Sequence, residues 1–185
     1  MDYLRVTEII SPFTGVEFVP FEILDKACER GTLVHEIIES KFDALSITEI
    51  PVHVSGYIKS FEQYVDEIDF STLDFTKERR FYCEKTGITG QIDMIINVDG
   101  KRFILDWKTS ARESLSWKLQ AAAYQYLCSV NGIEIDHMTF VKLCKKGGKP
   151  KTFTYDTYEH DLDIFFKCLE LYKFFDMKNT RRSCG

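Results

Sequence analysis

The chain has 185 residues, a length that fits one domain with a full hydrophobic core. Its 15 Phe and 9 Tyr residues exclude a disordered chain, and its net charge of −5 argues against binding a polyanion by bulk charge. That charge still permits a local basic patch, or an acidic site whose metal reverses the local sign.

The first half of the chain predicts two helices. The first twenty residues are expected to be irregular, with a turn at Ser-Pro-Phe-Thr-Gly. Residues 21–45 are helical in composition, with a break expected at Gly31, and residues 56–70 predict a second helix. The expected core stripe of the first helix is Val34, Ile37, Ile38, Phe42 and Leu45.

Three strands are expected next, at about residues 75–85, 90–98 and 101–108, with Gly87 in the first turn. Asp99-Gly100 between two alternating apolar runs is a strong hairpin signal, because both central residues of a type I′ turn need positive φ.

The second half of the chain completes the fold. Residues 114–130 predict a helix that ends at Asn131-Gly132, residues 137–156 a hairpin with a basic tip, and residues 160–177 a closing amphipathic helix. This order predicts an α/β fold, with a central mixed β-sheet that contains an antiparallel meander and is flanked by helices. We expect one domain over residues 1–185.

The two-residue turn sets the register of the hairpin, in which Val98 pairs with Lys101 and Asp93 lies opposite Asp106. Strand alternation puts Lys108 on the same face. Facing carboxylates destabilise a sheet and so require a compensating cation, and hard oxygen ligands suit Mg²⁺ or Mn²⁺. The alternative is a solvated face on which Asp93, Asp106 and Lys108 neutralise one another.

Six residues form an ordered set of motifs: His35 in GTLVHEIIE, Asp93 in GQID, Asp106 and Lys108 in LDWKTS, and Gln120 and Tyr124 in QAAAYQY. With this set, residues 30–127 resemble the PD-(D/E)XK nuclease superfamily. Within it they are most similar to the RecB-like exonuclease branch, which includes phage exonucleases and mitochondrial genome-maintenance exonucleases. The resemblance implies a restriction-endonuclease-like core of a helix, a three-stranded antiparallel meander, a helix and a further strand.

The resemblance also implies roles for these residues. Asp93 and Asp106 would bind the catalytic metal, with the backbone carbonyl of Trp107 as a further ligand and His35 as an additional metal-site residue. Lys108 would orient the attacking water or stabilise charge on the phosphorane-like transition state. For His35 the alternative is a packed helix histidine.

Gln120 and Tyr124 are four residues apart, so they share one helix face and would line the site. The alternative is a polar stripe that faces solvent. Many relatives carry another acidic ligand on the first strand of the meander, and Glu78 is the preferred candidate. Glu84 and Glu39 compete with it.

Several residues are candidates for contacting nucleic acid. Thr109 and Ser110 follow the lysine and could donate hydrogen bonds to a phosphate. Lys145, Lys146, Lys149 and Lys151 surround Gly147-Gly148 at the basic tip, where they would grip a backbone or merely form a solvated hairpin. Phe13, Phe18 and Tyr57 are candidates for stacking on bases.

The six cysteines include no Cys-x-x-Cys pair, a spacing that supports neither a zinc site nor an iron–sulfur cluster. Iron–sulfur relatives carry three closing cysteines, but Cys144, Cys168 and Cys184 are too dispersed, so no cluster is expected. We expect free thiols in a reducing cytoplasm. If the chain is phage-encoded, this would be the cytoplasm of the host. No apolar run approaches the ~20 residues of a membrane span.

The leading hypothesis is a metal-dependent DNA exonuclease of recombination, repair or genome processing, plausibly phage-encoded, that leaves 5′-phosphate products. Its substrate would be single- or double-stranded DNA with a free end, and an annealing or replication protein is the expected partner. A structure-specific or nicking endonuclease on the same core is the second hypothesis. A non-catalytic nucleic-acid-binding module is the third, although the chain retains both Asp residues and the Lys.

Overall fold

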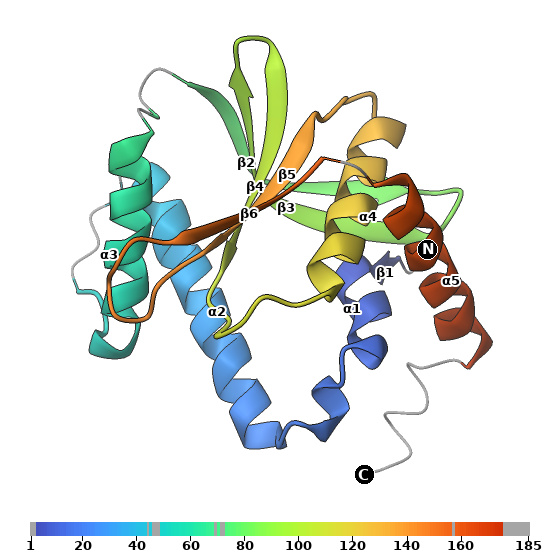
Figure 1. Ribbon diagram of the computed structural model, residues 1–185, viewed down its shortest axis with the longest axis horizontal. Helices are drawn as coiled ribbons and strands as arrows, with labels where there is room; N and C mark the ends of the chain where they lie inside the picture. Colours follow the sequence, from blue (N-terminus) through green and yellow to red (C-terminus); the bar gives the residue numbers. More distant parts are fainter. Residues whose placement is uncertain are drawn as a thin grey trace.

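The computed structural model describes residues 3–43, 45, 49–68, 70, 73–156 and 158–175 (Figure 1). The helices and strands follow one another as β1 (Leu4–Arg5), α1 (Val6–Ile10), η1 (Ser11–Phe13), η2 (Val16–Phe18), α2 (Phe21–Phe42), α3 (Val52–Glu67), β2 (Asp74–Cys83), β3 (Ile88–Val98), β4 (Lys101–Lys108), α4 (Ser116–Val130), β5 (His137–Lys142), β6 (Lys151–Tyr155) and α5 (Glu159–Phe174). No helix among the described residues is both long and apolar enough to cross a membrane.

The fold is the predicted mixed sheet flanked by helices. Its strand order is β1-β3-β4-β5-β6, and β2 pairs with β3 as well. The meander β2-β3-β4 is antiparallel, whereas β4 and β5 are parallel, with α4 in the connection between them. A parallel pair needs a crossover of this kind, because a short turn cannot return the chain to the same end of the sheet.

Two hydrophobic clusters cover the two faces of the sheet. One joins the sheet to α1, α4 and α5, and the other joins it to α2 and α3, as the two sides of Figure 1 show. Strand alternation explains the division for most residues, since Ile95 and Ile104 belong to the first cluster and Ile96 and Leu105 to the second.

The predicted hairpin register holds from Val98↔Lys101 to Met94↔Leu105 and then stops, so the predicted pairing of Asp93 with Asp106 is not formed. Beyond that pair the backbone N–H of Trp107 donates a hydrogen bond of 2.9 Å to the Asp93 side chain. Ile92, which alternation put on the face of Met94, belongs to the opposite cluster. The regular pairing of β3 with β4 is therefore broken next to Asp93.

A gap in one edge of β3 follows from this break. β1 pairs with β3 at Ile88 and Thr89, and β4 pairs with it from Met94 onward. Since β2 occupies the other edge throughout, β1 and β4 share one edge, and residues 90–93 have no strand beside them there. The predicted irregular N-terminus thus contributes a short strand that closes one end of the gap.

Several sequence predictions need correction. The first helix runs from Phe21 to Phe42 without the break expected at Gly31. Leu45 lies outside it and is 61% exposed instead of lying in the core stripe. The second helix begins at Val52, four residues before the predicted start, and ends at Glu67. Residues 176 and 177, predicted as the end of the last helix, and Cys184 lie outside the described residues.

The connection between β5 and β6, the predicted basic tip, is held against α3. Ser60 Oγ accepts the N–H of Cys144 at 2.9 Å, and the Gln63 amide donates to the Gly147 carbonyl at 2.6 Å. A Cβ on Gly56 would lie 1.9 Å from the Lys145 carbonyl oxygen, so the two backbones touch at a position that only glycine allows.

The close approach at Gly56 generates a stability prediction. Gly56→Ala should lower the free energy of unfolding by about 2 kcal/mol or more, because the added methyl group overlaps a backbone carbonyl. Helix propensity alone predicts that the same change raises the free energy of unfolding by up to about 1 kcal/mol. Thermal unfolding decides between them, with Ser55→Ala on the exposed side of α3 as the control, and a stabilised Gly56→Ala protein would contradict the close contact.

Candidate active site

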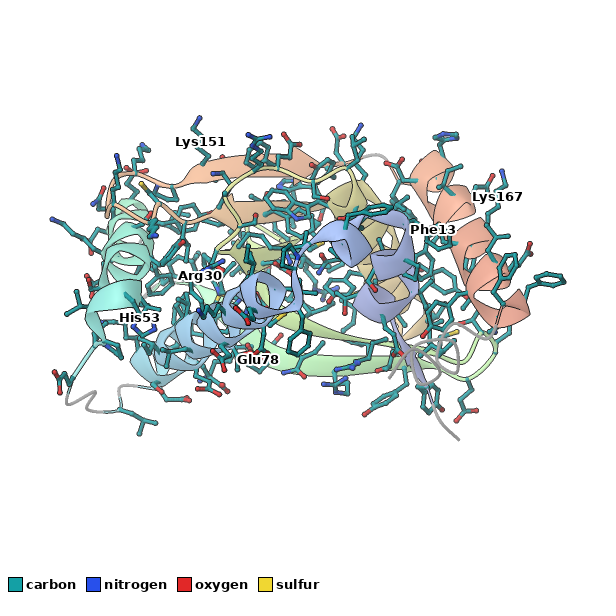
Figure 2. All side chains as sticks on the ribbon, turned by 90° about the horizontal axis from the view of Figure 1, so that it is seen from below. Phe13, Arg30, His53, Glu78, Lys151 and Lys167 are labelled. Atoms are coloured by element: carbon teal, nitrogen blue, oxygen red, sulfur yellow. The ribbon has the colours of Figure 1, made fainter. Side chains whose placement is uncertain are left out.

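A cavity of about 580 Å³ opens at the gap in β3. It brings together the ordered motif residues, because the gap exposes β3 and the end of β4 to α2 on one side and α4 on the other. The predicted residues that line it are His35, Glu78, Asp93, Asp106, Lys108, Gln120 and Tyr124. Figure 2 shows α2 crossing in front of the sheet in this region, with Arg30 and Glu78 labelled beside it.

His35 joins the two groups that the break in the hairpin leaves side by side. Its Nδ1 lies 3.3 Å from an Asp93 carboxylate oxygen, and its Nε2 lies 2.8 Å from the carbonyl oxygen of Trp107. Both partners are acceptors, so both ring nitrogens must carry a proton, which means an imidazolium ring. His35 is therefore not a mere packing residue, because its ring spans two groups predicted to bind a metal.

The electrostatics agree with this geometry. Burial acts to lower the pKa of His35, but the charge of Asp93 and its hydrogen bond, together with Asp106, raise that pKa to about 9. Burial acts to raise the pKa of Asp93, but the charge and hydrogen bond of His35 and the charge of Lys108 outweigh it, so this pKa is lowered. The lowered pKa favours the carboxylate form of Asp93, against which the His35 ring is held.

Asp106 differs from Asp93 in its partners and in the direction of its pKa shift. Its Oδ1 lies 2.6 Å from Lys108 Nζ, and its Oδ2 accepts a 3.1 Å hydrogen bond from the Gln120 amide. Burial and the nearby charge of Asp93 raise the pKa of this carboxyl to about 6, even though Lys108 lowers it. Asp106 Oδ1 has no hydrogen bond among the described residues. The two carboxylates are therefore inequivalent.

Glu78 lies inside β2, not at its start as predicted. Its φ of 49° is in the left-handed region, which costs a non-glycine residue about 1 kcal/mol or more. Gln91 donates a hydrogen bond to its carboxylate, and burial raises the pKa of Glu78, with Asp93 adding to the effect. The ligand atoms of Glu78, His35 and Asp93 all lie within 4.8 Å of one another.

The competitors of Glu78 are less well placed. Glu39 lines the cavity one helical turn after His35 but, like Asp106, lies outside the close group of ligand atoms. Glu84 is exposed in the turn after β2 and does not line the cavity. Among the described residues, the group formed by His35, Glu78 and Asp93 is the one in which three such side chains converge.

Gln120 and Tyr124 are both buried, which excludes the solvent-facing stripe considered for them. The Gln120 amide donates a hydrogen bond to Asp106. Burial and the charges of Asp106 and Asp93 raise the pKa of Tyr124. α4 comes this close because β3 has Gly90 here, where a Cβ would lie 2.8 Å from the Tyr124 ring.

The residues predicted to contact nucleic acid do not line this cavity. Thr109 is buried beside Gly31, and exposed Ser110 donates to the Arg112 carbonyl. Lys145 and Lys149 line a separate cavity, and exposed Lys146 lies in the same connection.

The stacking candidates differ in exposure. Phe18 is 84% exposed and Phe13 45%, whereas Tyr57 is buried beneath Arg30 and does not offer its ring for stacking.

Sequence reasoning missed several polar residues that line the cavity, among them Gln91 and Arg80. Gln91 bridges Arg80 and Glu78 by hydrogen bonds. Strand alternation already put Gln91 on the face of Asp93, which is the signal that could have identified it.

The family model of the PD-(D/E)XK nuclease superfamily matches residues 14–171. This match covers most of the chain, so the chain belongs to that superfamily. No curated protein matches the sequence.

Solved structures with similar folds include a candidate exonuclease from Eubacterium rectale, which is 17% identical, with a TM-score of 0.58 over 92% of this chain and 78% of that chain. The structure of SSO0001 is 12% identical in sequence, with a TM-score of 0.51 over 95% of this chain and 76% of that chain. LHK-Exo, an alkaline exonuclease from Laribacter hongkongensis, in its complex with dAMP, is 9% identical, with a TM-score of 0.50 over 99% and 93%. These likenesses show the fold and are consistent with the RecB-like branch.

The residues in the cavity fit the divalent metal that nucleases of this superfamily use. Carboxylates and a backbone carbonyl are hard oxygen donors, and one imidazole is compatible with Mn²⁺. Asp106, whose buried Oδ1 lies against the Lys108 ammonium, lines the same cavity. A metal that took Asp93 and the Trp107 carbonyl would have to displace the imidazolium of His35.

The raised pKa of Asp106 generates a pH-dependent stability prediction. A carboxyl whose pKa rises from 3.8 to about 6 on folding loses stability as pH rises between these values. Asp106→Asn removes that charge, so the metal-free variant should be more stable than the wild type above about pH 7, by roughly 1–3 kcal/mol. Below about pH 4 the difference should vanish, because Asp106 is then protonated in both states.

Denaturant unfolding in chelator at several pH values measures this difference. Asp136→Asn, which removes an exposed carboxylate at the opposite end of β4, is the control. A variant that is less stable than the wild type at about pH 8 would mean that the ion pair with Lys108 outweighs the burial of Asp106.

The imidazolium of His35 generates a prediction about metal binding. Since its pKa is about 9, the ring must lose a proton before it ligates a metal, so Mn²⁺ affinity should rise with pH up to about 9. Calorimetry in buffers of different ionisation enthalpy should detect about one proton released per Mn²⁺ ion. His35→Gln should abolish both the release and most of the pH dependence, and an unchanged proton count would remove His35 from the ligand set.

Proposed function

We propose that the chain is a metal-dependent DNA exonuclease that hydrolyses phosphodiester bonds to 5′-phosphate products in recombination, repair or genome processing. The observation that carries the proposal is the convergence of Asp93, Asp106 and Lys108 in one cavity, with His35 and the Trp107 carbonyl beside them.

Asp93, Asp106, the Trp107 carbonyl and His35 would hold Mg²⁺ or Mn²⁺, with Glu78 as a further ligand. When bound, the metal supplies Lewis acidity and lowers the pKa of coordinated water towards neutrality. His35 and Lys108 are the cations that balance Asp93 and Asp106 in the metal-free site. With Asp106 as a metal ligand, Lys108 would be free to contact the substrate, whereas His35 would join the ligand set after it loses a proton.

Lys108 would then turn its ammonium group from Asp106 to the substrate. It is a donor-only point charge, so it can orient a water oxygen or a phosphate oxygen but cannot ligate the metal. In the metal-free protein its ammonium lies over the Phe140 ring, with Nζ 5.0 Å from the ring centroid. Lys108 would thereby stabilise the charge that develops on the phosphorane-like transition state.

Gln120 and Tyr124 are proposed as positioning residues. The Gln120 amide holds Asp106 Oδ2 at 3.1 Å, which fixes the direction in which the other oxygen points. The buried hydroxyl of Tyr124 stays protonated, since burial and the two carboxylates raise its pKa. Thr109 and Ser110, at the end of β4, would donate to a substrate phosphate.

An exonuclease is favoured over an endonuclease by the names of the structural neighbours. LHK-Exo is named an alkaline exonuclease and is found with dAMP, a mononucleotide of the kind that stepwise cleavage from an end releases. A DNA partner with a free end follows from this proposal, and an annealing or replication protein is the proposed protein partner.

A digestion experiment tests the proposed function. With Mg²⁺ or Mn²⁺ the protein should release mononucleotides from labelled linear DNA and leave circular single-stranded DNA intact, and chelator should abolish cleavage. Cleavage of the circle would indicate an endonuclease. Full activity in chelator would remove the metal mechanism altogether.

Two variants should separate the roles of the polar residues. Lys108→Ala should reduce kcat by about a hundredfold or more while Mn²⁺ binding persists, because lysine is not a ligand. Asp93→Ala should abolish both cleavage and Mn²⁺ binding. Lys101→Ala, at the other end of β4, is the control, and a Lys108→Ala protein that loses Mn²⁺ binding would contradict the division of roles.

A further inference from the structure

Three lysines form a row across three neighbouring strands. In the register of the sheet Lys108 of β4 pairs with Lys142 of β5, and Lys142 pairs with Lys151 of β6. Paired residues of adjacent strands point to the same face, and the strands lie about 4.8 Å apart. The lysine row, meaning Lys108, Lys142 and Lys151, therefore runs about 10 Å at right angles to the strands.

This row is electrostatically unbalanced. Lys108 pairs with Asp106, but among the described residues neither Lys142 nor Lys151 forms an ion pair. Lys142 donates to the Ala111 carbonyl at 3.2 Å, a neutral acceptor. Like charges at directly opposed positions destabilise a sheet unless an anion lies between them.

The row links two cavities. Lys108 lines the active-site cavity, while Lys142 and Lys151 line a second cavity of about 220 Å³. Ser110 also lines the second cavity, and it follows Lys108 by only two residues. The end of β4 and the residues directly after it therefore contribute to both cavities.

The second cavity has a preformed basic wall. Lys145 and Lys149 reach it from the β5–β6 connection, which is held against α3 by Ser60 and Gln63. Lys149 pairs with Glu67 at 2.8 Å, so its charge is partly satisfied. The unbalanced charge of the cavity thus comes mainly from Lys142, Lys145 and Lys151.

We propose that the lysine row binds successive backbone phosphates of one DNA strand, so that the strand crosses β4, β5 and β6 from the active-site cavity into the second cavity. The proposal rests on the proposed nuclease function. A cavity of about 220 Å³ is smaller than the roughly 300–1,000 Å³ of drug-sized sites, which suits one extended strand and not a duplex. A row of about 10 Å is long enough to contact more than one phosphate along such a strand.

Binding without cleavage tests the row directly. The probe is a labelled single-stranded oligonucleotide in chelator, titrated over a series of salt concentrations. Lys142→Gln combined with Lys151→Gln should weaken binding about tenfold and reduce the slope of log affinity against log salt by about 1.4, or 0.7 per lysine.

A matched control removes the same charge elsewhere. Lys101→Gln combined with Lys167→Gln changes two exposed lysines far from the row, and Figure 2 shows Lys151 and Lys167 at opposite ends of the molecule. The control should bind the oligonucleotide within about twofold of the wild type. Equal effects of the two double variants would overturn the row, since bulk charge would then explain both.

Chain length provides a second measurement. The row variant should lose at least about tenfold more kcat/KM on a long single strand than on a dinucleotide, which ends before the second cavity. Equal losses on both substrates would mean a disturbed active site and would overturn the proposal. A wild-type protein that cleaves neither substrate would refute the nuclease function instead, so the two failures are distinguishable.

Discussion

The burial of two carboxylates beside each other is the constraint on which the rest of the site depends. Each one requires its own cation, because an unpaired buried carboxylate would take up a proton instead. His35 serves Asp93 and Lys108 serves Asp106. The pairing is incomplete, since the pKa of Asp106 still rises to about 6. A divalent cation would satisfy both carboxylates at once, so the arrangement that costs the metal-free protein stability also favours the ligand.

The gap in β3 explains how so many polar groups reach one point. β1 and β4 share an edge of β3 and leave residues 90–93 between them. Without a strand there, the Trp107 N–H bonds to the Asp93 side chain, and α4 approaches closely enough at Gly90 to bring in Gln120 and Tyr124. A regular three-stranded sheet would have filled this edge with backbone hydrogen bonds. The interruption of pairing is thus what creates the cavity.

Much of the site could be predicted from the sequence, because local rules determine it. The Asp-Gly turn sets the hairpin register, and helical spacing puts Gln120 and Tyr124 on one face. What could not be predicted depends on contacts distant in sequence. The pairing of β1 with β3, the left-handed backbone of Glu78 and the burial of Tyr57 under Arg30 arise only when separate segments pack. The prediction that Leu45 lies in the core stripe was wrong because a helical pattern does not mark the residue at which a helix ends.

The lysine row also bears on why the sheet extends beyond the meander. The chemistry draws on β2, β3 and β4, while β5 and β6 contribute Lys142 and Lys151 alongside Lys108. A lysine on an edge strand can serve to prevent pairing with other chains, which would account for Lys151 on β6. It does not account for Lys142, because β5 lies between β4 and β6 and has no free edge along the paired residues. Protection of the edge therefore explains one lysine, whereas a polyanion lying across the strands explains the alignment of all three.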